Sequence, residues 1–124
     1  MNFGQRRFQA ENWSVLVLAN ATQAIWTYTV PFKCVLELLE FGNYMDTVAA
    51  WGVNSFVFTQ NAVPFNFAGG YPAIMDQVGY AAQRQRFDPV LFTGGNLIQC
   101  WGVEATGGNV QMGISVGYNL IDQE

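Results

Sequence analysis

The chain holds few of the side chains that usually carry out catalysis. Its 124 residues include no histidine and only two cysteines, Cys34 and Cys100. Without histidine, a serine or cysteine nucleophile lacks its usual general base, and a zinc ion lacks one of its commonest ligands. The cysteines form no CxxC pair, so we expect both to be small buried hydrophobic residues. The sequence therefore predicts a protein that is not an enzyme and has no cofactor or metal site.

Acidic residues are the next candidates for chemistry. Glu37 and Glu40 lie close together in a segment that has the pattern of a strand. A glycosidase needs two carboxylates that face one cleft. Because side chains alternate between the two faces of a strand, Glu37 and Glu40 should point to opposite faces. This spacing argues against an active site built from these two carboxylates.

Aromatic side chains in loops are candidates for binding. Trp51, Tyr71 and Tyr80 fall in or near loops rather than on alternating strand faces. Sugar rings stack on such side chains, so these three residues are candidates for a glycan or receptor site. Loop aromatics also cap the open end of a sandwich or fill a contact between subunits, and the sequence leaves these alternatives open.

The composition indicates a protein that assembles. Charged residues make up 11% of the chain and hydrophobic residues 51%, whereas a typical soluble domain is about 25% charged. We therefore expect part of the surface to be hidden in an assembly. The net charge of −4, with five basic residues, disfavours nucleic acid and anionic membranes as partners. No apolar run reaches the roughly 18 residues of a membrane-spanning helix.

Short apolar runs separated by turn residues predict strands along most of the chain. Residues 1–12 are polar without a clean period, so we expect an N-terminal arm there and a single domain over 13–124. The segments with a strand pattern are 13–19, 23–30, 33–41, 52–60, 86–93, 96–105 and 109–121. Segment 74–83 has the composition of a short helix. Many short strands with little helix predict an all-β protein, an antiparallel β-sandwich or barrel.

The tetrapeptide Thr-Gly-Gly-Asn occurs twice, at 93–96 and at 106–109. Glycine pairs supply the positive φ angles that tight turns need. Both copies lie between predicted strands, so we expect the last three strands to form an antiparallel meander.

Two predicted strands have a second face that suits a subunit contact. In the segment 33–41, apolar residues fall on both faces, which indicates one face in the core and one in a subunit contact; a β-bulge that realigns the residues is the alternative. In the segment 109–121, one face is apolar and should pack on the opposite sheet, near Trp26, Tyr28 and Phe58. The other face is nearly bare, so a neighbouring subunit could approach its backbone closely. The candidate contact residues are Val35, Leu39, Phe41, Gly113, Ser115 and Gly117.

Three segments carry a resemblance to a known class of protein. Val30-Pro31-Phe32-Lys33 places a proline at the entry to a strand, Pro89-Val90-Leu91-Phe92 begins a hairpin pattern, and Val116-Gly117-Tyr118 lies in the closing strand. In this order they resemble the small jelly-roll accessory proteins of tailed-bacteriophage virions, of the decoration, vertex or fibre-head type. The resemblance spans about residues 23–121 and consists of loose strand and turn patterns. Phe32 departs from it, because a turn glycine is common at that position.

The resemblance implies a jelly-roll fold and a structural role in the virion without catalysis. It implies a homotrimer that docks on the major capsid protein or another virion protein, with Arg6 and Arg7 as candidate contacts to acidic groups of the shell. One alternative is a receptor- or glycan-binding head domain of a spike or fibre. Another is a single-jelly-roll coat protein, although a coat protein that packages nucleic acid usually has a more basic arm.

Overall fold

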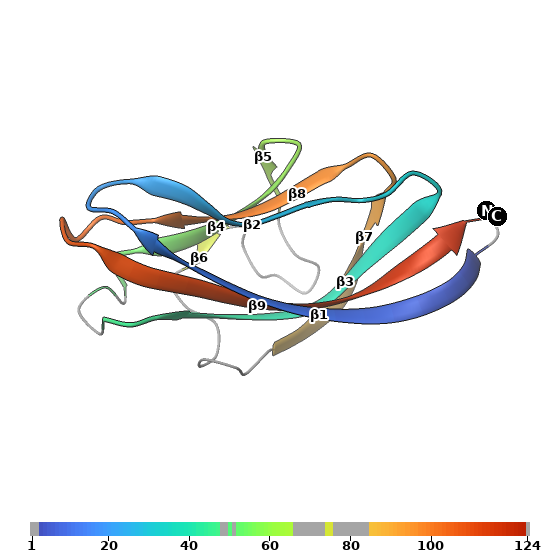
Figure 1. The fold of residues 1–124 in the computed structure, drawn as a ribbon, viewed down its shortest axis with the longest axis horizontal. Helices are drawn as coiled ribbons and strands as arrows, with labels where there is room; N and C mark the ends of the chain where they lie inside the picture. Colours follow the sequence, from blue (N-terminus) through green and yellow to red (C-terminus); the bar gives the residue numbers. More distant parts are fainter. Residues whose placement is uncertain (1–2, 48–49, 51, 66–73, 76–84, 124) are drawn as a thin grey trace.

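The computed structural model describes residues 3–47, 50, 52–65, 74–75 and 85–123. In this part of the chain, nine strands form two antiparallel sheets that pack face to face (Figure 1). The strands are β1 Phe3–Val17, β2 Thr22–Thr29, β3 Cys34–Met45, β4 Ser55–Gln60, β5 Val63–Pro64, β6 Ile74–Met75, β7 Gln85–Thr93, β8 Leu97–Val103 and β9 Val110–Gln123. The all-β sandwich predicted from the sequence is confirmed.

The strands are paired in a nested order. One sheet has the order β1-β9-β3-β7 and the other the order β2-β8-β4-β5, with β6 also paired to β4. Thus β1 pairs with β9, β2 with β8, β3 with β7 and β4 with β5, all antiparallel. This is the topology of a jelly roll, in which one long antiparallel hairpin is rolled into two sheets.

The expected C-terminal meander is wrong, because β8 does not lie beside β7 or β9. β7 and β9 belong to the four-stranded sheet, while β8 belongs to the other sheet. The two Thr-Gly-Gly-Asn tetrapeptides therefore carry the chain from one sheet to the other. Gly95 and Gly107 adopt φ angles of 90° and 87°, which glycine reaches without steric cost. Local turn residues specify a reversal of the chain but not the sheet that the next strand joins.

The expected N-terminal arm is also wrong from residue 3 onward. Residues 3–12 are the first part of β1, which pairs with β9 in a regular register from Arg6 to Val17. The polar composition of this stretch reflects its position as an edge strand whose side chains are largely exposed. The expected helix at 74–83 is wrong at its first two residues, which form β6; residues 76–83 lie outside the described part of the chain.

The core lies between the two sheets. Val110, Met112, Ile114, Val116 and Tyr118 of β9 all face it and are at most 3% exposed. Two of the neighbours expected for this row are confirmed by ring contacts. The ring centroid of Tyr118 lies 6.3 Å from that of Trp26 and 5.4 Å from that of Tyr28.

A β-bulge in β3 decides which of its residues reach the core. The register of β3 against both β7 and β9 shifts between Leu38 and Glu40, so that Leu39 is an extra residue. The shift brings Phe41 onto the same face as Leu38. Phe41 is fully buried, and its ring centroid lies 4.7 Å from that of Phe58. The expectation that Phe41 forms a subunit contact is therefore wrong, since the bulge places it in the core.

We expect Phe41→Ala to lower the free energy of unfolding by about 3–5 kcal/mol, because it leaves a cavity among buried rings. Leu91→Ala, at a side chain that is 56% exposed, is the matched control and should change stability by less than about 0.5 kcal/mol. Urea denaturation measures both. A Phe41→Ala variant that keeps its stability but loses its oligomeric mass would place Phe41 at a subunit contact instead.

Glu104 fastens the turn between β8 and β9. Its side chain is buried, and its carboxylate accepts hydrogen bonds from the backbone N–H of Thr106 at 2.9 Å and of Gly107 at 2.7 Å, and from the Thr106 hydroxyl at 2.8 Å. Its own backbone N–H donates to the carbonyl oxygen of Ala21, which ties the turn to the β1–β2 connection. Burial raises the pKa of Glu104, but the hydrogen bonds outweigh it and hold the pKa at about 2.

This lowered pKa predicts a specific pH dependence. The carboxylate of Glu104 stabilises the fold fully above its ordinary pKa of 4.5, and this contribution is lost as the pH falls from there towards 2. Glu104→Gln should therefore be less stable than the unmodified protein at pH 7, and the difference should shrink between pH 5 and pH 2. Urea denaturation over this range checks it, and a difference that stays constant with pH would contradict it.

Candidate functional site

Two glycines of β9 on the outer face of the four-stranded sheet are covered by side chains of the same protein. A Cβ atom added to Gly113 would lie 2.0 Å from the ring of Tyr44, and one added to Gly117 would lie 2.6 Å from the carboxylate of Glu40. Both covering residues come from β3, directly beside β9. The expectation that a neighbouring subunit occupies this space is therefore wrong. Here the glycines make room for side chains of the adjacent strand.

A hollow of about 210 Å³ lies beside these glycines. Ser115 of β9, Asn12 of β1 and Gly42 of β3 are opposite one another in the sheet, and all three line it. The remaining lining residues are Trp13, Ser14, Asn43, Tyr44 and Ile114. No charged residue is among them, and the lining combines an aromatic phenol with hydroxyl and amide groups. Such a hollow is suited to a neutral polar ligand.

Val35 and Leu39 offer little surface to a partner. Val35 lies on the outer face of the four-stranded sheet, opposite Ile121, and both are only 2% exposed. Leu39, at the bulge, is 9% exposed. All three lie outside the main core cluster, yet the single chain already buries them. A contact with a second subunit would remove very little more of their surface from water.

The bulge also corrects the expectation for Glu37 and Glu40. Glu37 is opposite Asn119 and Glu40 is opposite Gly117, so both carboxylates lie on the outer face. The extra residue between them cancels the usual alternation of side chains. Glu37 accepts a hydrogen bond from the Asn119 amide at 2.9 Å and lies 3.9 Å from Arg6. These contacts hold Glu37 in the sheet surface.

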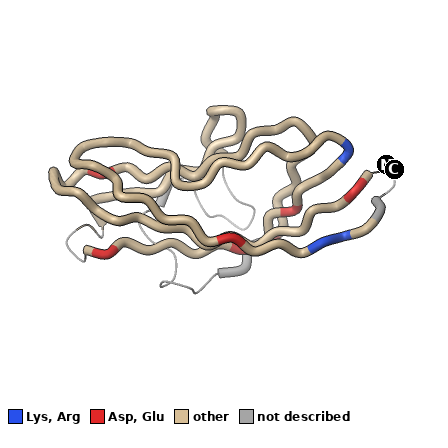
Figure 2. The backbone as a smooth tube through the Cα atoms, viewed as in Figure 1, with Lys and Arg blue, Asp and Glu red and all other residues tan. Residues whose placement is uncertain are grey.

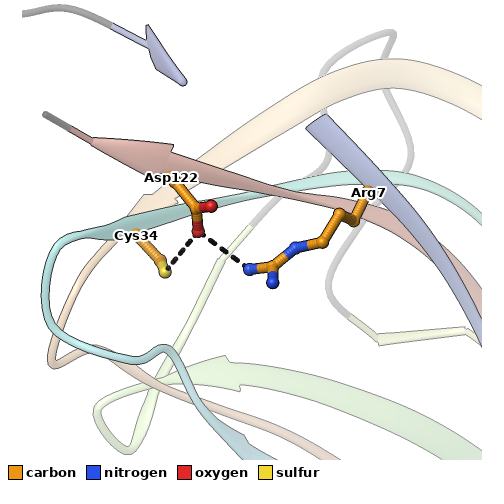
Figure 3. A network of polar contacts seen from close by, with 3 residues as sticks. All are labelled: Arg7, Cys34 and Asp122. Carbon is orange, nitrogen blue, oxygen red and sulfur yellow. Dashed lines mark hydrogen bonds and ion pairs between the residues drawn. The ribbon is translucent and has the colours of Figure 1, made fainter. Parts of the chain in front are cut away.

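Arg7, Asp122 and Cys34 form a polar cluster at one end of the sandwich (Figure 3). The Arg7 guanidinium donates to Asp122 Oδ1 at 2.8 Å, and the Cys34 thiol donates to the same oxygen at 3.5 Å. Burial, the hydrogen bond to Asp122 and its negative charge all raise the pKa of Cys34. The thiol therefore stays protonated at neutral pH and is a poor nucleophile. Cys100 is fully buried, and burial raises its pKa as well.

The two arginines expected to dock on a shell are thus engaged within the chain. Arg6 approaches Glu37 and Arg7 binds Asp122, and both arginine side chains stay partly exposed. Exposed ion pairs of this kind contribute little to stability individually. Their effect here is to hold the first part of β1 against β9 and β3.

A second polar cluster joins β1 to the aromatic end of the core. The Tyr118 hydroxyl donates to Glu11 Oε2 at 2.5 Å, and the Trp13 indole N–H donates to Glu11 Oε1 at 3.1 Å. Burial and the hydrogen bond to Glu11 raise the pKa of Tyr118, so the phenol remains protonated at neutral pH. Glu11 therefore acts as an acceptor that anchors an edge strand, and the cluster has no activated nucleophile.

The outer face of the other sheet has a different character. Its three long strands, β2, β4 and β8, contain no Asp, Glu, Lys or Arg, although the chain has fourteen such residues, five basic and nine acidic. In Figure 2 the backbone of these strands is drawn in tan, the colour of residues other than Lys, Arg, Asp and Glu. We call the outward-facing side chains of these three strands the neutral face. Its centre is formed by Ala24, Val57, Thr59, Gln99, Trp101 and Val103.

Side-chain hydrogen bonds connect the strands across the neutral face. The Trp101 indole N–H donates to the Thr59 hydroxyl at 3.0 Å, and the Gln99 amide donates to the Thr27 hydroxyl at 3.3 Å. Trp101 and Val57 oppose each other and are both partly exposed. A face that lacks charge and carries a central tryptophan has the composition of the inner part of a protein interface.

The residues expected to form a glycan or receptor site, Trp51, Tyr71 and Tyr80, lie outside the described residues. Within the described residues, no three His, Cys, Asp or Glu side chains gather as ligands for a metal ion. No helix in the described part of the chain is long and apolar enough to cross a membrane. The sequence matches no known protein-family model and shows no significant similarity to a curated protein.

Sequence reasoning missed both the neutral face and the hollow. The signal for the neutral face was present, because the segments 22–29, 55–60 and 97–103 are free of charge. These three segments are neighbours only because β8 lies between β2 and β4, an arrangement that the sequence pattern does not specify. The hollow had no local signal, since its residues come from three strands that are distant in sequence.

We expect Gly113→Ala to destabilise the fold by about 1–3 kcal/mol, because the added methyl group overlaps the Tyr44 ring. Tyr44→Ala in the same chain should remove most of that cost, since it vacates the space. Gly108→Ala, at an exposed turn with free space, is the control and should be nearly neutral. Urea denaturation of the single and double variants measures the coupling. Additive effects of the two substitutions would contradict the contact.

Proposed function

We propose that this protein is a structural component of a virus particle, of the capsid decoration or accessory type, and that it oligomerises on the particle. The single observation that carries the proposal is the neutral face. A small protein that stays monomeric in solution needs charge on its surface, and here one whole sheet has none. Burial of this face against other protein surfaces would explain why the sheet carries no charge.

The fold supports a structural role. Nested antiparallel pairing leaves each sheet with one broad outer surface, and the outer surface of the four-stranded sheet is already occupied in part by its own Tyr44, Glu40 and the Arg6–Glu37 ion pair. The neutral face is therefore the sheet surface best suited to a partner. The polar clusters at Cys34 and Tyr118 hold protonated groups and serve to anchor β1.

The location in a virion and the homotrimer follow from the resemblance to phage accessory proteins. The partners proposed on this basis are further copies of the chain and the major capsid protein or another virion protein. The nested jelly-roll order is consistent with that resemblance, although a fold alone does not define a function.

We expect Trp101→Lys to break the neutral-face contact and so lower the oligomeric mass at micromolar concentration, because it places a charge at the centre of an apolar contact. Leu91→Lys, at an exposed site on the other sheet, is the matched control and should leave the oligomer intact. Light scattering gives the masses, and circular dichroism checks that both variants fold. An unmodified protein that is monomeric under these conditions would overturn the proposed self-association.

The virion assignment has its own test. The purified protein should co-sediment with phage shells to a fixed ratio of copies per shell protein, and Trp101→Lys should reduce that ratio. Leu91→Lys serves again as the control. An absence of saturable binding to shells, with the oligomer intact, would reject the role in the virion and leave the self-association standing.

The hollow at Ser115 favours a second candidate function, a receptor- or glycan-binding head. Tyr44 supplies an aromatic ring, while Asn12, Ser14 and Ser115 supply hydrogen-bonding groups without charge. A glycan array with the unmodified protein would identify a ligand, and Tyr44→Ala should abolish its binding. An array without hits, at a concentration at which the protein is folded, would remove this candidate.

A further inference from the structure

β1 is a long edge strand with its backbone open on one side. Among the described residues it pairs only with β9, and every side chain from Gln5 to Ala10 is exposed. From Arg6 to Val17 its register is regular, without a bulge or proline. Natural proteins usually protect such edges with prolines, bulges or charges, because free N–H and C=O groups attract another strand.

The charges on β1 do not protect this edge. Arg6 and Arg7 are drawn towards Glu37 and Asp122, and Glu11 is held by the Tyr118 hydroxyl. Each contact directs the charged group back over its own sheet and away from the open side. Meanwhile Phe8, Trp13 and Leu16 are about half exposed, at 51%, 51% and 49%. The edge thus combines open backbone groups with exposed apolar side chains.

We propose that β1 pairs with β1 of a second copy of this chain, antiparallel and centred on Asn12. The contact would join two four-stranded sheets into one sheet of eight strands across a two-fold axis. It goes beyond the proposed function, because it requires neither the neutral face nor a virion.

The choice of register follows from faces and charges. Opposed residues in a continuous sheet must share a face, so the centre falls on a residue and not between two residues. The regular part of β1 runs from Arg6 to Val17, which leaves Glu11 and Asn12 as the central positions. Centring on Glu11 would oppose two carboxylates directly at the axis, which is unfavourable. Centring on Asn12 opposes two amides, which can both donate and accept hydrogen bonds.

The Asn12 register also matches the side chains on both faces. On the outer face Phe8 opposes Leu16 of the second copy, and symmetry repeats this apolar pair on the other side of the axis. On the inner side Glu11 lies opposite Trp13 of the second copy. Within one chain, the Trp13 indole N–H already donates a hydrogen bond to the Glu11 carboxylate, so the two groups are chemically matched. Small residues, Ala10 and Ser14, oppose each other between these pairs. Cross-strand pairs of this kind stabilise a sheet.

A symmetric disulfide tests the register. In Asn12→Cys the two new thiols would face each other across the axis, at the Cα separation of opposed residues, which a disulfide bridges without strain. Under mild oxidation we expect this variant to form a covalent dimer. Ala10→Cys and Ser14→Cys are the matched controls, because each thiol would lie about 13 Å from its own copy along the partner strand. A mixture of the two control variants should form the mixed dimer.

The outcomes are distinct. A dimer yield for Asn12→Cys at least about tenfold above either control alone supports the contact, given the narrow distance range of a disulfide. Equal yields for all three variants, or none for Asn12→Cys in the folded protein, overturn it. The unmodified protein shows the background from Cys34 and Cys100, which are buried.

A charge pair gives independent support without cysteine. Phe8→Lys alone should weaken the dimer. Phe8→Lys combined with Leu16→Glu should restore it, because the new ammonium group and the new carboxylate would lie opposite each other across the contact and attract. Analytical ultracentrifugation is done in the Trp101→Lys background, so that loss of the neutral-face contact is separated from loss of the edge contact. A failure of Leu16→Glu to restore the Phe8→Lys dimer overturns the register.

Discussion

The pairing of β9 on both of its sides is the constraint on which the rest of the structure depends. β9 lies between β1 and β3, so its register is fixed twice, and its apolar row from Val110 to Tyr118 is held towards the core. Because of the bulge at Leu39, β3 stays paired with β9 along its length while the Phe41 side chain points into the core. On the other side of β9, Gly113 and Gly117 leave room for side chains of β3. β9 therefore contributes a row of side chains to the core on one face, and on the other face it makes room for the side chains of β3 that cover the sheet.

Charge is distributed unequally between the two sheets. The strands of the four-stranded sheet hold eight charged residues, of which Arg6, Arg7, Glu11, Glu37 and Asp122 contact one another or a tyrosine within the chain. The sheet of β2, β8 and β4 holds no charge on these strands. Several charges of the four-stranded sheet are thus engaged in contacts within the chain, whereas the neutral face offers only neutral groups. This asymmetry is the physical basis of the proposal that the protein functions within an assembly.

The two polar clusters in the described part of the chain have a structural role. Cys34 and Tyr118 have raised pKa values and remain protonated at neutral pH, while their partners Asp122 and Glu11 accept hydrogen bonds. Both clusters fasten β1, an edge strand with few buried side chains. The backbone of β1 is thereby held in an extended, regular form, as pairing with another strand requires.

The sequence by itself determined where most strands run, because alternation of apolar and polar residues is a local property. It located β2, β8 and β9 closely and predicted the all-β sandwich, with Trp26 and Tyr28 near the last strand. Only the tertiary structure decided which strands are neighbours. An isolated pattern gives a strand its faces but not its partner, so the meander was wrong and the N-terminal arm proved to be a paired strand. The bulge at Leu39 was likewise decided by pairing, since two partners fix the register of β3 and one extra residue must be left out.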